Sequence, residues 1–170
     1  MNRKILALVA ASAVVASVVV VSTSEAAQAT ANATATVIAP ISISKTADLR
    51  FGKFSALTGG SVVISTGGAR SATGAVVLSS TDAGGAASFS VSGDANATYA
   101  ITLPGSATIT HTVDGTKSMS VGTFTSNPSG TGTLSAGGAE TLNVGGTLTV
   151  GNAQTVGSYT GTFDVSVEYN

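Results

Sequence analysis

The sequence predicts an all-β protein: a sandwich of about seven to nine short strands, preceded by a signal peptide and a strand-like N-terminal extension. Three observations predict it. Apolar residues recur at every second position through much of the chain, which is the period of a strand with one buried face. Glycine-rich segments separate these runs, as expected of turns. After residue 26 nothing shows the 3.6-residue period of a helix.

The first 26 residues have the pattern of a secretory signal peptide. A basic start precedes an apolar run over residues 5–21, and small-x-small cleavage sites follow at 24–26 and 27–29. A membrane anchor is the alternative, but the run has 17 residues, slightly fewer than the ~18 to 20 that span a bilayer. We therefore expect cleavage near Ala26, with a secreted chain at the cell surface, or in the periplasm in transit, and no membrane span after cleavage.

The charge composition excludes one class of function. After cleavage at Ala26 the chain carries five cations and seven anions, so its net charge is near −2 and no cationic cluster remains. Nucleic-acid binding needs a cationic stripe, so no nucleic-acid partner is expected. The chain has no cysteine, which excludes a lipid-anchored lipoprotein. Removing 26 of 170 residues leaves 144, enough for one domain with its own core.

Side chains that usually carry catalysis or bind metals are sparse. His111 is the only histidine, and it occupies an apolar strand position where packing is the expected role. A metal site needs three or four converging ligands, and a serine nucleophile needs a base beside it. We therefore expect no enzyme, no catalytic residue, no metal and no cofactor. A loop calcium site that uses Asp82 or Asp94 with Asn96 is an open alternative to ordinary turn-forming aspartates.

The C-terminus gives the strongest strand prediction. From Tyr159 to Tyr169 every second residue is apolar or glycine, and the residues between are polar. We expect a hairpin across residues 92–96 and a tight type I′ hairpin at Asp114-Gly115. The Gly-Gly pairs, Gly145-Gly146 among them, are interpreted as turns or bulges. Shorter apolar alternations predict the other strands, near residues 41–51, 62–64, 76–78, 89–91, 99–103, 109–113, 119–124, 142–144 and 148–150.

Residues 27–39 differ from the rest of the chain. Alanine and valine alternate there with polar residues, and Pro40, which has no N–H to donate, ends the ladder. We therefore predict an extension over 27–39 and a sandwich domain over 40–170. The extension is a candidate donor strand; a first strand of its own domain and a disordered tether are the alternatives. As a donor, it would turn one set of side chains inward: Ala29, Ala31, Ala33, Ala35 and Val37.

Two stretches carry a family resemblance, ATVIAPISISKTADLRFGKF at residues 35–54 and GSYTGTFDVSVEYN at 157–170. With them the chain resembles a domain-of-unknown-function family (DUF4402-like) of small secreted β-proteins from Gram-negative bacteria. More loosely it is similar to chaperone–usher pilins, including the spore-coat-U-like branch. Those proteins have an early Leu-x-Phe-Gly motif and a penultimate aromatic residue, matched here by Leu49, Phe51, Gly52 and Tyr169.

The pilin resemblance implies an immunoglobulin-like sandwich that lacks its last strand. A neighbour's N-terminal extension fills the gap in that group, and a periplasmic chaperone fills it beforehand. The implied partners are copies of the chain in a filament, a periplasmic chaperone and an outer-membrane usher. We thus expect a structural subunit of a surface filament or pilus; a secreted monomeric module that binds glycan or calcium is the alternative. The assembly residues would be the five donor positions together with Phe163, Val165, Val167 and Tyr169.

Overall fold

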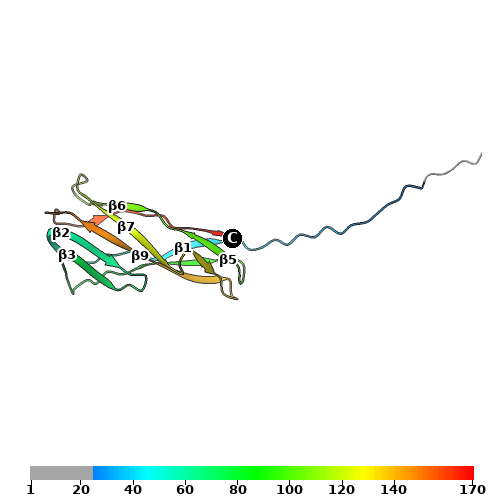
Figure 1. The fold of residues 1–170 in the computed structure, drawn as a ribbon, viewed down its shortest axis with the longest axis horizontal. Helices are drawn as coiled ribbons and strands as arrows, with labels where there is room; N and C mark the ends of the chain where they lie inside the picture. The colour runs from blue at the N-terminus through cyan, green and yellow to red at the C-terminus, as the bar shows by residue number, and fades with distance from the viewer. Residues whose placement is uncertain (1–24) are drawn as a thin grey trace, which may run out of the picture. The chain divides into compact units, whose positions relative to one another are not determined.

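The computed structural model describes residues 25–170, and most of the predicted signal peptide lies outside these residues. The described chain is all-β, with eleven strands and no helix. This confirms the predicted fold class, although we expected only about seven to nine strands. It divides into an N-terminal unit that ends at Thr36 and a domain over Val37–Asn170 (Figure 1). Residues 25–36 form no strand, and all of them are exposed.

The strands in chain order are β1 (Ser42–Ala47), β2 (Phe54–Ile64), β3 (Arg70–Leu78), β4 (Ala87–Ser92), β5 (Thr98–Thr102), β6 (Ser106–His111), β7 (Ser118–Asn127), β8 (Thr131–Thr133), β9 (Ala139–Val150), β10 (Tyr159–Thr160) and β11 (Ser166–Tyr169). Eight of them form one sheet, in the order β1-β4-β9-β7-β6-β10, with β2 beside β9 and β3 beside β2. The smaller sheet has the order β11-β5-β8. The two sheets give a sandwich-like domain.

Strand β9 organises the larger sheet. β7 pairs along one of its edges, while the other edge pairs with β4 over Ala139–Val144 and with β2 over Gly146–Val150. Gly145 lies where the partner changes, and a β-carbon there would overlap the carbonyl oxygen of Ile64 at the end of β2. Gly145-Gly146 is therefore not a turn, the first of the two roles that we predicted. The pair lies within one continuous strand, opposite the register shift of β7 between Gly122 and Thr125, and it permits a close backbone approach.

The predicted tight hairpin is confirmed in its pairing and wrong in its turn. β6 and β7 pair antiparallel, but residues 112–117 connect them, and Gly115 is not among the residues with positive φ. A type I′ turn needs positive φ at both central positions. Asp114 instead shapes the loop, since its carboxylate accepts hydrogen bonds from the amide (3.1 Å) and hydroxyl (2.6 Å) of Thr116. These bonds hold the pKa of Asp114 below its ordinary value.

The predicted hairpin across residues 92–96 is wrong. β4 lies in the larger sheet and β5 in the smaller one, so the connection crosses between layers. Val91 and Tyr99 are both 0% exposed and belong to the same buried cluster. They meet across the sandwich instead of lying side by side. Period-2 apolar patterns identify the buried face of a strand, but they do not identify the strand beside it.

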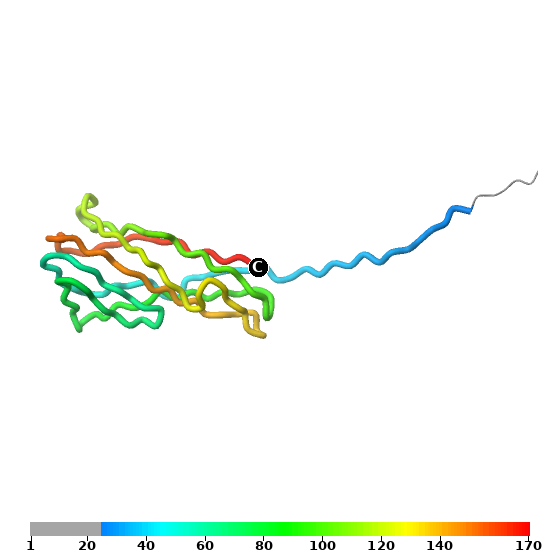
Figure 2. Tube along the Cα trace, in the orientation of Figure 1, coloured from blue at the N-terminus to red at the C-terminus, as the bar shows by residue number. Residues whose placement is uncertain are grey.

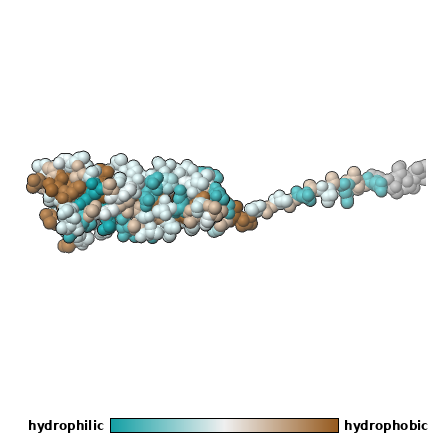
Figure 3. Space-filling model, turned by 90° about the horizontal axis from the view of Figure 1, so that it is seen from below, coloured by the Kyte–Doolittle hydropathy of each residue, from teal (hydrophilic) through white to brown (hydrophobic). Residues whose placement is uncertain are grey.

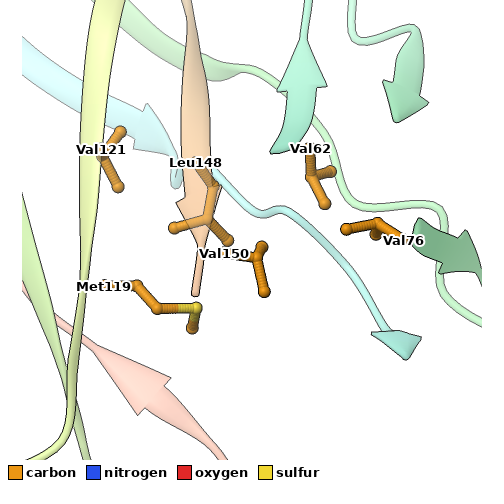
Figure 4. Close-up of a cluster of buried hydrophobic side chains, with 6 residues drawn as sticks. All are labelled: Val62, Val76, Met119, Val121, Leu148 and Val150. Atoms are coloured by element: carbon orange, nitrogen blue, oxygen red, sulfur yellow. The ribbon is translucent and has the colours of Figure 1, made fainter. Parts of the chain in front are cut away.

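Two clusters of buried side chains make the core, and no phenylalanine is fully buried in either. All five phenylalanines are only partly buried around the clusters, although phenylalanine facing a closed sandwich core is normally buried. The core is therefore open on one side. The first cluster is Val62, Val76, Met119, Val121, Leu148 and Val150 (Figure 4). The second is Ala87, Val91, Tyr99, Leu134, Leu142 and Val144.

Candidate functional site: an open groove along the sandwich

The C-terminal segment forms one wall of the opening. It runs along β6 and then β5, as the red trace in Figure 2 shows. Tyr159, Phe163 and Val165 are partly buried and the polar residues between them are exposed, as the alternation predicts. The predicted continuous strand is nevertheless interrupted, because residues 161–165 belong to neither β10 nor β11.

The interruption follows from a mismatch in length. Thr160 pairs with Thr110 and Ser166 with Thr102, so the five residues 161–165 face the seven residues 103–109. Pro104 within that opposing stretch has no N–H to offer. Residues 161–165 consequently have no backbone hydrogen-bond partner among the described residues. The backbone N–H and C=O groups of such an edge must form hydrogen bonds with water or with another strand.

Residues 45–56 form the opposite wall, and Arg70 holds its centre. The Arg70 guanidinium donates hydrogen bonds to the carbonyls of Phe51 (3.0 Å), Lys53 (3.1 Å) and Ser79. Two of these carbonyls, those of Phe51 and Lys53, belong to a segment that has no strand of its own from residue 48 to 53, so one charged, planar group holds this segment against Ser79. Sequence reasoning missed this contact, since nothing near Arg70 in the sequence identifies partners 17 and 19 residues away.

Between the walls lies a groove of about 990 Å³. Its floor includes side chains of the two core clusters and their margins: Ala87, Phe89, Ile109, Met119, Val121 and Leu148. Lys45, Arg50 and Lys53 line one rim with Asp48 and Asp82. Lys45 is 2.6 Å from Asp48, and Arg50 is 3.7 Å from Asp82. The groove therefore combines an apolar floor, one charged rim and one unpaired backbone edge.

The predicted assembly residues fall into two groups. The C-terminal four pack, partly buried, against the second cluster: Phe163, Val165, Val167 and Tyr169. Phe163 also lines the groove, with its ring centroid 5.0 Å from that of Phe124 and 6.5 Å from that of Phe89. The donor positions are exposed and lie in no strand, and Val37 is 96% exposed: Ala29, Ala31, Ala33, Ala35 and Val37.

His111 occupies a structural position beside the groove. Its Nδ1 accepts hydrogen bonds from the amides of Val113 (3.2 Å) and Asp114 (2.9 Å), and its ring lies edge-on to Tyr159 at 5.0 Å. Within residues 25–170 no three His, Cys, Asp or Glu side chains lie close enough together to bind a metal ion. No helix in the same range is long and apolar enough to cross a membrane.

Comparison with known families supplies an identity for this domain. The family model for a domain of unknown function, DUF4402, matches residues 41–169. The chain belongs to the DUF4402 family. The match begins next to Pro40 and ends at Tyr169, so the DUF4402 domain includes both walls and the floor of the groove. This match confirms the predicted family, while the looser similarity to pilins stays a prediction. No curated protein and no solved structure matches the chain.

Proposed function

We propose that this DUF4402 protein is an exported structural subunit of a surface filament, in which the extension of one copy inserts as a strand into the groove of the next. The open groove supports the proposal most directly. A five-residue edge without backbone partners, residues 161–165, begins in the groove wall, and the groove floor consists of buried and partly buried apolar side chains. An added strand would pair its backbone with the edge and lie over the apolar floor.

The extension has a suitable length. Residues 27–39 are thirteen residues, and at ~3.3 Å per residue they reach about 43 Å when extended. The C-terminal wall, residues 154–163, is ten residues long and spans at most about 33 Å on the same scale, because it bends at residues 156–157. One extension is thus long enough to run the whole wall and still leave a short link to its own domain.

Small side chains suit this groove because its floor is already occupied by Phe89, Ile109 and Met119. Alanines turned inward would add little apolar burial at ~25 cal/mol per Å². Backbone pairing would supply most of the affinity, with roughly ten hydrogen bonds at about 1 kcal/mol net each. Specificity would then come from excluding larger or charged residues at the inward positions.

Insertion into a neighbour fits the course of the chain better than insertion into the same domain. β1 starts at Ser42 and leads directly into the wall formed by residues 45–56. An extension that entered its own groove would have to reverse direction between Val37 and Ser42. Pro40 opposes a tight reversal there, because it biases the preceding residue toward extended backbone.

Assembly can be tested with a matched pair of variants of the chain that begins at Ala27. Ala33→Lys places a charge at an inward position, and Thr34→Lys places the same charge at the adjacent outward position. We expect Ala33→Lys to abolish detergent-resistant multimers on unboiled gels and in light scattering, and Thr34→Lys to retain them. Multimers of a variant without residues 27–39, or equal assembly of both lysine variants, would overturn the proposal.

Hydrogen exchange gives a second readout. In the variant without residues 27–39, the amides of residues 161–165 should exchange rapidly, since they have no backbone partner. A synthetic peptide of residues 27–39 should slow their exchange, while a peptide with Ala33→Lys should not. Unchanged exchange with the native peptide would contradict strand insertion at this edge.

Export and the partners implied by the pilin resemblance belong to the same proposal. A subunit with an uncovered apolar groove is prone to aggregate before assembly. A periplasmic chaperone that covers the groove and an outer-membrane usher that releases the subunit would prevent that. The alternative of a monomeric glycan-binding or calcium-binding module has weaker support. Tyr99 is buried and Tyr159 and Tyr169 are partly buried, so these rings offer no exposed platform for a sugar.

A further inference from the structure

The large apolar side chains that are exposed in the described chain occur in two separate places. Val37 and Ile38 are 96% and 50% exposed, where the domain begins. Four others are between 63% and 95% exposed, and we call them the apolar end: Leu57, Val77, Val113 and Val156. Isolated exposed aliphatic residues are ordinary, but a cluster of them indicates a contact surface.

The four residues of the apolar end form two pairs, one beside each wall at the same end of the groove. Val77 pairs with Ser55, two residues before Leu57, at the end of the 45–56 wall. On the other wall, the Val156 carbonyl lies 3.2 Å from Nε2 of His111. Nδ1 of the same imidazole accepts a hydrogen bond from the amide of Val113. Figure 3 shows brown, apolar atoms gathered at one end of the domain.

Val37 and Ile38 lie near the opposite mouth. They precede Ala39, whose carbonyl accepts a hydrogen bond from the hydroxyl of Tyr169. Tyr169 ends the C-terminal segment, of which residues 154–156 begin the groove wall. The chain therefore presents an apolar pair at one end of its groove and an apolar cluster at the other.

We propose that the apolar end of each copy is covered by Val37 and Ile38 of the copy whose extension fills its groove. This inference rests on the proposed strand insertion. This contact fixes the direction in which the extension runs along the groove, because the last residues of the incoming extension must then lie beside Val156 and Leu57. The extension runs parallel to residues 45–56 and antiparallel to residues 154–163.

A contact of this kind is heterologous: two different surfaces of identical subunits meet, and repetition gives a filament and not a closed dimer. Six aliphatic side chains bury far less than the ~1,000 Å² that a stable independent interface needs. The inserted strand compensates, since it holds the two surfaces together at a high effective concentration. The contact therefore adds to the lifetime of a joined pair and does not create the pair.

Crosslinking tests polarity separately from insertion, because the chain has no cysteine of its own. The acceptor lacks residues 27–36 and carries one engineered cysteine, and the donor carries another; a short bismaleimide joins those that lie close. Asn32→Cys in the donor with Thr160→Cys in the acceptor reports insertion near the middle of the groove. Val37→Cys with Val156→Cys reports the proposed end contact, and Val37→Cys with Thr162→Cys reports the reverse polarity.

We expect products from the first two pairs and none from the third. A product from the middle pair with none from Val37–Val156, or with one from Val37–Thr162, overturns the end contact and leaves strand insertion intact. Absence of the middle product overturns strand insertion itself. A crosslink between two Val156→Cys acceptors would show that apolar ends pair with each other, which also contradicts the inference.

A kinetic measurement tests the contact without a crosslinker. Val113→Thr with Val156→Thr keeps the side-chain shape but makes both exposed surfaces polar. We expect joined pairs of this variant to dissociate about tenfold faster than the wild type, with the thermal midpoint of the variant domain lacking residues 27–39 unchanged. Equal lifetimes of the mutant and wild-type pairs would overturn the inference.

Discussion

The hydroxyl of Tyr169 donates a hydrogen bond to the backbone carbonyl of Ala39, 2.8 Å away. The same hydroxyl accepts a hydrogen bond of 2.6 Å from the amide of Asp94. The residue before Pro40 is thereby tied to the last strand and to the β4–β5 connection. This hydroxyl fixes the point at which the chain leaves the domain toward its extension.

Tyr169→Phe should release the backbone at Ala39 from the domain while keeping the aromatic packing. We expect a loss of about 1 kcal/mol in unfolding free energy for the bonds of one hydroxyl, and faster cleavage by elastase at residues 37–39. Tyr159→Phe is the matched control, because its hydroxyl also bonds a backbone carbonyl, that of Thr155, at 2.7 Å. Equal cleavage rates in the two variants would show that Tyr169 does not hold this segment.

Gly145→Ala should disturb β9 at the point where its pairing partner changes from β4 to β2. Its β-carbon would overlap the Ile64 carbonyl, so backbone must move, and we expect a destabilisation of about 1–3 kcal/mol in urea unfolding. Gly122→Ala in neighbouring β7 is the control, since the nearest atom to its β-carbon, Gly105 O, is 3.7 Å away. A Gly145→Ala protein as stable as Gly122→Ala would contradict the close approach of β2.

The sequence predicted the strands well because half-buried β-strands carry a period-2 pattern in their own residues. The faces of β2, β4, β7 and β9 were correct for that reason. What failed was pairing, which depends on residues far apart in the chain. Val91 and Tyr99 have the pattern of a hairpin yet belong to different sheets, and no local signal separates those outcomes.

The candidate site was only half predictable. Alternation identified the inward set Phe163 to Tyr169, and Pro40 indicated a boundary near the start of β1 at Ser42. The open edge arises from five residues facing seven, a mismatch that exists only once both strands are paired. The Arg70 contacts to the opposite wall likewise require the β2–β3 hairpin to be folded.

Alkaline pH should destabilise the domain through Tyr99. Burial in the core, and then the hydrogen bond and charge of Glu140, raise the pKa of its hydroxyl. The unfolded chain ionises this tyrosine near pH 10, while the folded chain keeps it neutral. The stabilising effect of the neutral form is therefore complete below about pH 10 and is lost as pH rises toward the folded-state pKa.

Tyr99→Phe tests this linkage. The variant should lose stability at pH 7, because Glu140 keeps only the Thr133 amide (2.9 Å) as a hydrogen-bond donor. Its unfolding free energy should then fall less steeply above pH 10 than that of the wild type. Urea unfolding at half-unit steps from pH 8 to 11 provides the measurement. Parallel pH profiles for the two proteins would contradict the assignment.

Two arginines near the same groove wall should differ widely in their contribution. Arg70 bonds three backbone carbonyls, and each hydrogen bond to a charged group contributes about 1.5–3 kcal/mol. Arg50 reaches Asp82 only at 3.7 Å, with its side chain 62% exposed, and such pairs contribute about 0–1 kcal/mol. We expect Arg70→Leu to cost more than about 3 kcal/mol and Arg50→Leu less than about 1.

Substitutions of Arg70 and Arg50 also test whether the 45–56 wall contributes to strand binding in the groove. Loss of Arg70 releases residues 51–53, so their amides should exchange faster and the peptide of residues 27–39 should bind more weakly, even where the domain remains folded. Arg50→Leu should leave both readouts near wild type. Arg70→Lys should not restore them, because one ammonium lacks the planar fork that reaches several carbonyls. Peptide binding that survives Arg70→Leu in a folded domain would show that the 45–56 wall is not part of the strand-binding surface.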